Sequence, residues 1–183
     1  MPPLSALPSV QGTTVLAVDD DPDALNLCRV FLEKAGFSVL SAAGSSEALK
    51  ICKSHSGPIH LLITDLVMPP PDFSFASGDN EFPHVHGHEL AIRALRMRKD
   101  LHVILMSANI DRDLQGYGIR RGCVPFITKP LEAQVLVSLA HDTLKAPPPT
   151  VESLQKEHTG ESKSAEEWFD KSLPPTLHAS SAE

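Results

Sequence analysis

Short apolar stretches alternate with amphipathic ones along most of this chain, and this alternation constrains its fold more than any other feature. Five stretches are short and apolar enough to be buried strands: residues 15–18, 37–42, 61–64, 102–106 and 124–128. Successive apolar positions, as in residues 61–64, suit a strand that is covered on both faces. The alternation therefore predicts an α/β fold, a doubly wound parallel sheet with right-handed crossovers and helices on both faces.

Apolar residues repeat at helical spacing between and after these stretches. The expected helices cover residues 22–35, 45–52, 89–98, 114–121 and 131–144. Asp21 can cap the first of them with Pro22 in its first turn, and Gly36 is a typical helix end. A helix over residues 114–121 is expected despite two glycines, Gly116 and Gly118.

Composition narrows the class of protein. The chain has 183 residues, of which 23 are acidic and 16 basic, so its net charge of -7 gives it no electrostatic attraction to nucleic acid. The three cysteines, Cys28, Cys52 and Cys123, fit no metal or redox spacing and are interpreted as reduced thiols. Neither a signal peptide nor a membrane-spanning run is evident, so a cytoplasmic location without membrane contact is expected.

The chain divides into three parts by composition. Residues 1–12 contain three prolines and no charged side chain, and they predict a flexible leader. Residues 13–145 hold all the expected strands and helices. Residues 146–183 are rich in polar residues and predict a mostly disordered, acidic tail. Within that tail, residues 164–173 contain a capping box and the sole tryptophan, Trp168, which leaves open a short docking helix or a lone aromatic residue.

Polar side chains stand at the ends of four expected strands. Asp19 and Asp20 follow the first strand, Asp65 the third, Ser107 the fourth and Lys129 the fifth. Since the carboxyl ends of parallel strands meet at one edge of a sheet, these side chains should converge. Clustered carboxylates repel one another unless a cation lies among them, and oxygen ligands suit Mg²⁺. With the lysine and the serine, the cluster predicts a phosphoryl site in which Asp65 is the nucleophile.

Residues 13–145 resemble the receiver domain of two-component response regulators. Four stretches carry the resemblance: VLAVDDDP at residues 15–22, LLITDLVMP at 61–69, VILMSA at 103–108 and PFITKPL at 125–131. The resemblance implies a flavodoxin-like sheet with strand order 2-1-3-4-5.

The resemblance also implies roles for single residues at the phosphorylation site. Asp65 would be the phosphoacceptor. The metal ligands for Mg²⁺ would be Asp19, Asp20, Asp65 and the backbone carbonyl of Val67, with Asp20 the more direct ligand of the acidic pair. Without the resemblance, Asp19 or Asp20 could simply cap the following helix.

Four further positions match the family pattern. Ser107 would be the switch hydroxyl, Lys129 the phosphate-binding lysine and Phe126 the aromatic switch residue. The bond between Lys129 and Pro130 falls where the family has a cis peptide. A strand-end role for Ser107 and a core role for Phe126 are the alternatives.

The expected function is that of a stand-alone response regulator. Asp65 would be charged by a histidine kinase or a histidine phosphotransfer protein, and the signal would reach a downstream protein target by contact. The chain would not be an enzyme beyond its own phosphoryl transfer and dephosphorylation. Alternatives are a phosphorelay intermediate, a degenerate receiver used as a scaffold, and an aspartyl-phosphate phosphohydrolase; a homodimer is left open.

The chain departs from the family pattern after the third strand. Gly87, which matches a family glycine, comes farther along the chain than usual, so residues 69–86 are a long inserted loop. Its phenylalanines, Phe73, Phe75 and Phe82, suit a lid or docking ridge, and a disordered elaboration is the alternative. Histidines alternate at the end of the insertion, and a metal site or a merely solvated loop is open there. They are His84, His86 and His88.

Overall fold

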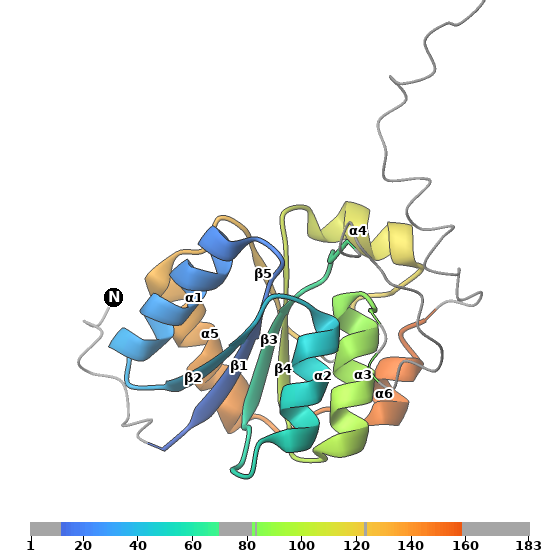
Figure 1. Ribbon diagram of the computed structural model, residues 1–183. Coiled ribbons are helices and arrows are strands. Elements are labelled where there is room, and N and C mark those ends of the chain that lie inside the picture. Colours follow the sequence, from blue (N-terminus) through green and yellow to red (C-terminus); the bar gives the residue numbers. More distant parts are fainter. Residues whose placement is uncertain (1–11, 70–81, 83, 123, 159–183) are drawn as a thin grey trace, which may run out of the picture.

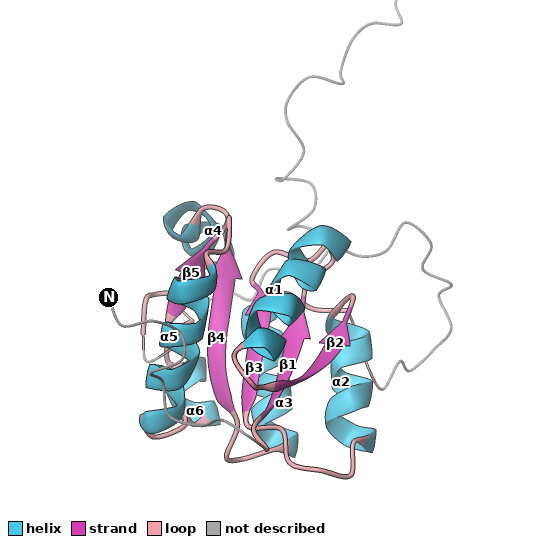
Figure 2. Ribbon diagram, turned by 90° about the vertical axis from the view of Figure 1, so that its left-hand side faces the viewer, coloured by secondary structure: helices cyan, strands magenta, loops and turns pink. Residues whose placement is uncertain are grey.

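Five strands form one parallel sheet with the order β2-β1-β3-β4-β5, as predicted (Figure 1). The computed structural model describes residues 12–69, 82, 84–122 and 124–158. The strands are β1 (Thr14–Val18), β2 (Ser38–Ala42), β3 (Leu61–Asp65), β4 (His102–Ser107) and β5 (Phe126–Thr128). Figure 2 shows their arrows running in the same direction. The doubly wound, flavodoxin-like arrangement is confirmed.

Helices cover both faces of this sheet (Figure 1). They are α1 (Pro22–Lys34), α2 (Ser45–Ser54), α3 (Gly87–Met97), α4 (Ile110–Tyr117), α5 (Ala133–Lys145) and α6 (Val151–Gln155). α1 and α5 lie on one face, whereas α2 and α3 lie on the other, with α6 packed beside α3. α4 lies at the edge where the strands end.

Alternating side chains of the central strands pack into two hydrophobic cores, one on each face of the sheet. In β1, Leu16 and Val18 belong to the core under α2 and α3, and Val15 and Ala17 to the core under α1 and α5. All four are fully buried. Successive side chains of a strand point to opposite faces, so a strand with helices on both sides must be apolar throughout.

Local sequence signals predict the ends of α1 correctly, whereas the predicted bounds of α4 differ from the observed ones. Asp21 accepts hydrogen bonds from the Asp23 and Ala24 amides at the start of α1, as predicted. The prediction of a helix over residues 114–121 was wrong, because α4 covers residues 110–117. The side chain of Asn109 caps its start, and Gly118, with φ of 63°, ends it in the left-handed region.

The packed structure continues beyond residue 145, where the sequence placed the start of a mostly disordered tail. Thr150 and Ser153 form a capping box that opens α6, and Leu154 is fully buried in the core under α3. The Arg120 amide then donates to the carbonyl of Glu157, at 2.8 Å. The leader (residues 1–11), Phe73 and Phe75, and the Trp168 segment lie outside the described residues.

Two further expectations concern cysteines and membranes. Cys28 and Cys52 are free and buried, and burial raises the pKa of their thiols to about 12 and about 11. These two side chains therefore fill core as predicted, while Cys123 lies outside the described residues. None of the described helices has both the length and the apolar character needed to cross a membrane.

Candidate functional site

Parallel register brings the predicted site residues to one edge of the sheet. Val18 pairs with Thr64, so Asp19 and Asp65 follow at adjacent positions. Ser107 pairs with Thr128, which puts Lys129 next to the end of β4. The register thus gathers side chains that are up to 110 residues apart in the chain, from Asp19 to Lys129.

Three carboxylates form the acidic part of this site. Asp19, Asp20 and Asp65 each place an oxygen within 4.8 Å of the others. Asp19 is fully buried, Asp65 is 7% exposed, and Asp20 is exposed. Burial raises the pKa of Asp65 to about 6, although Lys129 opposes that shift. Burial, with a smaller contribution from the Asp19 charge, also raises the pKa of Asp20.

The donor set of this cluster fits a hard divalent cation. All its ligand atoms are carboxylate oxygens, which Mg²⁺ prefers. Asp19 Oδ2 is buried without an aligned hydrogen bond, although the Lys129 ammonium lies 2.7 Å away as an ion pair. A buried carboxylate oxygen in that condition is costly, and a cation at the cluster would offset the cost.

Lys129 supplies the positive charge of the site. Its Nζ contacts Asp19 Oδ2 and donates a short hydrogen bond to Asp65 Oδ2. Burial alone would lower the pKa of Lys129, but its close contacts with these two aspartates and their negative charges raise it above its usual value. The ammonium is therefore fixed between the two buried carboxylates. The adjoining Lys129–Pro130 peptide bond is cis, as the resemblance implied.

The backbone around Asp65 is held closely. The Val67 amide donates to Asp65 Oδ1 at 3.1 Å, which fixes one carboxylate oxygen. At Gly87, the first residue of α3, a Cβ atom would lie 2.0 Å from the carbonyl oxygen of Asp65. A side chain there would collide with backbone, so α3 can approach the end of β3 only with glycine at this position.

Ser107 is buried and engaged on the side of α4. Its Oγ donates to Asp113 Oδ2 at 2.6 Å and accepts from the Asn109 amide at 2.9 Å. Sequence reasoning missed Asp113, which carries no family motif; it lies six residues after Ser107, in the first turn of α4. Phe126 is half-buried at the edge of the core, and the Arg121 guanidinium lies 5.8 Å from its ring centre.

The three alternating histidines have three different surroundings. His84 Nε2 bonds the Met68 carbonyl at 2.8 Å, His86 caps α3, and His88 is fully buried. His88 lies between Glu157 and His158, at 2.9 and 3.0 Å, two partners that the sequence did not indicate. Within the described ranges, only Asp19, Asp20 and Asp65 gather ligand atoms as a metal site requires.

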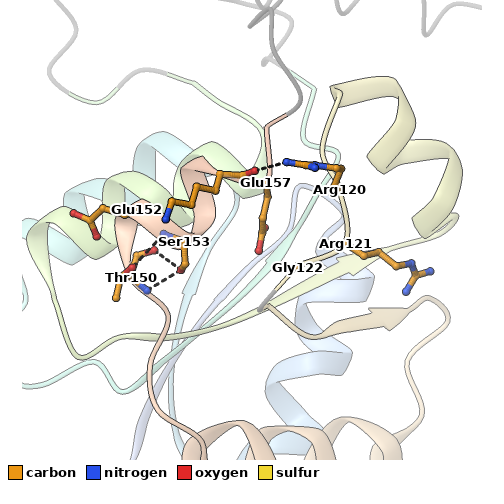
Figure 3. Close-up of a pocket in the computed structure, with 8 residues that line it drawn as sticks. Arg120, Arg121, Gly122, Thr150, Glu152, Ser153 and Glu157 are labelled. Atoms are coloured by element: carbon orange, nitrogen blue, oxygen red, sulfur yellow. Dashed lines mark hydrogen bonds between the residues drawn. The ribbon is translucent and has the colours of Figure 1, made fainter.

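A concavity of about 420 Å³ lies between α6 and the segment before β5 (Figure 3). Every residue that lines it except Gly122 has a polar or charged side chain, and none of them belongs to the acidic site. Two of its cations already have partners, since Arg120 donates to the Lys156 carbonyl and Arg121 pairs with Asp111. The pocket therefore offers less free charge than its composition suggests.

Comparison with known proteins agrees with this geometry. The family model for the response regulator receiver domain matches residues 15–141. The two-component response regulator ARR18 of Arabidopsis thaliana is 31% identical over 134 residues, which are 73% of this chain and 19% of that protein. The transcriptional regulatory protein AruR of Pseudomonas aeruginosa is 29% identical, over 72% of this chain and 49% of that protein. The chain thus spans half or less of the length of these relatives.

Solved structures with the same fold include two receiver proteins. The receiver domain of the hybrid histidine kinase CckA superposes with a TM-score of 0.53 at 25% identity, over 72% of this chain and 98% of that one. A response regulator receiver protein from Sinorhizobium medicae superposes with a TM-score of 0.58 at 20% identity, over 75% of this chain and 98% of that one. The second likeness concerns the fold alone.

Proposed function

The chain belongs to the response regulator receiver domain family, and on that premise we propose that it accepts a phosphoryl group on Asp65 and signals through protein contacts. One observation carries the proposal. A nearly buried carboxylate, Asp65, meets an ammonium, Lys129, beside two further acids at the rim of a parallel sheet. That combination suits a group with several anionic oxygens and a divalent cation.

The phosphoryl donor would be a phosphohistidine of a histidine kinase or phosphotransfer protein. A carboxylate oxygen of Asp65 attacks phosphorus, and the bond from phosphorus to the imidazole nitrogen breaks with its electron pair going to the imidazole. Lys129 offsets negative charge on the phosphoryl oxygens, and Ser107 can donate a hydrogen bond to one of them. Mg²⁺ bound by Asp19, Asp20, Asp65 and the Val67 carbonyl would supply further charge stabilisation.

The phosphorylated protein would signal to a downstream protein. The net charge of -7 supports a protein partner over nucleic acid, which attracts basic surfaces. Phosphorylation would draw Ser107 toward the phosphoryl group and let Phe126 turn inward, which changes the surface around α4 and β5. A phosphorelay intermediate would use the same site chemistry.

A phosphohydrolase is the less favoured alternative. Such enzymes place a second aspartate two residues after the nucleophile as the general acid, and this chain has Val67 there. Valine cannot move a proton. A degenerate receiver is also disfavoured, because every acidic and basic position of the site is filled.

The proposal is tested by the substitution Asp65→Asn. The amide cannot attack phosphorus but keeps the shape of the side chain, so labelling by acetyl phosphate with Mg²⁺ should vanish while circular dichroism shows an intact fold. Asp142→Asn, at an exposed acid on α5, is the matched control and should label like the wild type. Label retained by folded Asp65→Asn protein would place the phosphoacceptor elsewhere.

A further inference from the structure

The hydroxyl of Ser107 already has both of its hydrogen-bonding roles filled. It donates to Asp113 Oδ2 at 2.6 Å and accepts from the Asn109 amide at 2.9 Å. Both partners belong to the start of α4, since Asn109 is its N-cap and Asp113 lies in its first turn. Ser107 is therefore tied to α4 and not to the acidic site.

Asp113 is unlike the other acid at the start of this helix. Its side chain is only 10% exposed, and the nearest cationic atom recorded for it, Arg112 Nε, lies 3.7 Å away on an exposed side chain. Asp111 instead is 84% exposed and pairs with Arg121. A largely buried carboxylate needs donors, and the Ser107 hydroxyl is a close one.

We propose that Asp113 is a positioning residue that holds the Ser107 hydroxyl away from the phosphoryl site until Asp65 is phosphorylated. The inference rests on the proposed function and adds to it the group that opposes switching. A serine hydroxyl has one proton to donate. The phosphoryl oxygen and the Asp113 carboxylate therefore compete for the same proton.

The competition joins the chemistry at Asp65 to the position of α4. A hydrogen bond to a carboxylate is roughly twice as strong as one between neutral groups, so the unphosphorylated arrangement resists the turn of Ser107. When the hydroxyl turns to the phosphoryl group, both Asp113 and the Asn109 amide lose a partner. The first turn of α4 is then released from the end of β4.

The test uses beryllofluoride, an analogue of the phosphoryl group, with Mg²⁺ present. Asp113→Asn replaces the charged acceptor by a neutral one of the same shape, so Ser107 should turn more easily. Beryllofluoride should then bind about fivefold more tightly than to the wild type, given the weaker hydrogen bond that is lost. Asp111→Asn removes the same charge from the same helix without touching Ser107 and should bind like the wild type.

A second background separates positioning from simple charge repulsion. In Ser107→Ala protein the competing hydroxyl is absent, so adding Asp113→Asn should leave the beryllofluoride affinity unchanged. A gain of the same size in that background would show that the Asp113 charge acts directly on the bound anion and would overturn the inference.

Failure of this inference and failure of the proposed function give different results. Wild-type protein that binds beryllofluoride no better than Asp65→Asn would overturn the proposed function, and the inference with it. Tight binding to the wild type with equal affinity in Asp113→Asn would overturn the inference alone.

Discussion

At the scale of single residues, the site is defined by an imbalance of charge. Lys129 is shared between Asp19 and Asp65, while Asp20 belongs to the same cluster. One ammonium cannot neutralise three carboxylates, so the cluster keeps a negative excess when all three are ionised. That excess gives a divalent cation its driving force to bind.

The first prediction at this scale concerns Asp20. Asp20→Ala should weaken Mg²⁺ binding by about tenfold or more, because one carboxylate and one unit of charge are lost from a site a few ångströms across. Isothermal titration calorimetry measures the change. Asp23→Ala, at an exposed acid in the first turn of α1, controls for net charge and should bind as the wild type does. Equal affinities in Asp20→Ala and the wild type would move the metal away from this cluster.

The second prediction at this scale concerns how long the phosphoryl group stays on Asp65. Hydrolysis needs a water behind phosphorus, and the residue two positions after the phosphoacceptor faces that approach in the family. Val67 can neither orient nor activate a water, so Val67→Glu and Val67→Asn should release phosphate faster than the wild type. Release is followed from pre-labelled protein with Mg²⁺. Asn109, which could hold a water, works in the opposite direction. Faster release from the wild type than from either Val67 variant would show that shielding by Val67 does not set the lifetime.

At the scale of elements, some helix boundaries could be predicted from sequence and others could not. α1 follows from Asp21, Pro22 and Gly36, whose preferences are local and agree with one another. The prediction placed α4 too late because its N-cap, Asn109, comes only two residues after the end of β4, and because Gly118 ends the helix just before the apolar Ile119. Its contact with Ser107 depends on a tertiary approach that spacing cannot express.

α6 is the element that sequence reasoning missed. Five residues are too few for a stable helix on their own, even with the good helix formers Glu152, Leu154 and Gln155. Its stability comes from partners far away in sequence: Leu154 enters the core under α3, and Glu157 bonds His88 across 69 residues. The acidic site was predictable because parallel strands bring their carboxyl ends together. No comparable rule predicts from sequence that α6 packs against α3.

A prediction at this scale tests the docking of the segment after α6. A Cβ atom on Gly122 would lie 1.8 Å from Glu157 Oε1, so Gly122→Ala should push Glu157 out of place and cost about 1–3 kcal/mol of stability. The Arg120 amide, which donates to the Glu157 carbonyl, should exchange its hydrogen faster.

Gly116→Ala is the matched control for that substitution. A Cβ atom there meets nothing within 4 Å, and Gly116 lies inside α4. Alanine favours a helix over glycine by up to about 1 kcal/mol, so this variant should be as stable as the wild type or more so. Unchanged exchange at Arg120 in folded Gly122→Ala protein would contradict the close packing of Glu157.

At the scale of the whole molecule, a cluster of histidines links stability to pH. Burial, with the nearby charges of His88 and His158, lowers the pKa of His86 from 6.5 to about 3. The ring also packs against Tyr117, and Glu89 and Glu157 complete the charged surroundings of the cluster. The folded protein therefore disfavours protonation that the unfolded chain accepts.

The contribution of His86 to stability is thus present above pH 6.5 and is lost as the pH falls from 6.5 toward 3. Over that window His86→Asn should reduce the pH dependence of unfolding by up to about 1.4 kcal/mol per pH unit, while asparagine can still cap α3. Urea titrations at several pH values measure this slope. His55→Asn, outside the cluster, controls for the loss of a histidine, and an unaltered slope in His86→Asn would exclude His86 as the titrating group.

The hydrogen bond from His84 to the Met68 carbonyl joins two positions that are 16 residues apart. The Val85 amide adds a second anchor on Ser45. With both ends fixed to the folded body, extra length between them costs mainly closure entropy, which grows by only about 0.6 kcal/mol for each doubling of a flexible loop. A foreign peptide such as an epitope or a sensor tag, inserted after Met68 and before Phe82, would therefore have both of its ends anchored to the folded body, because Phe82 packs against the core and His84 holds the Met68 carbonyl.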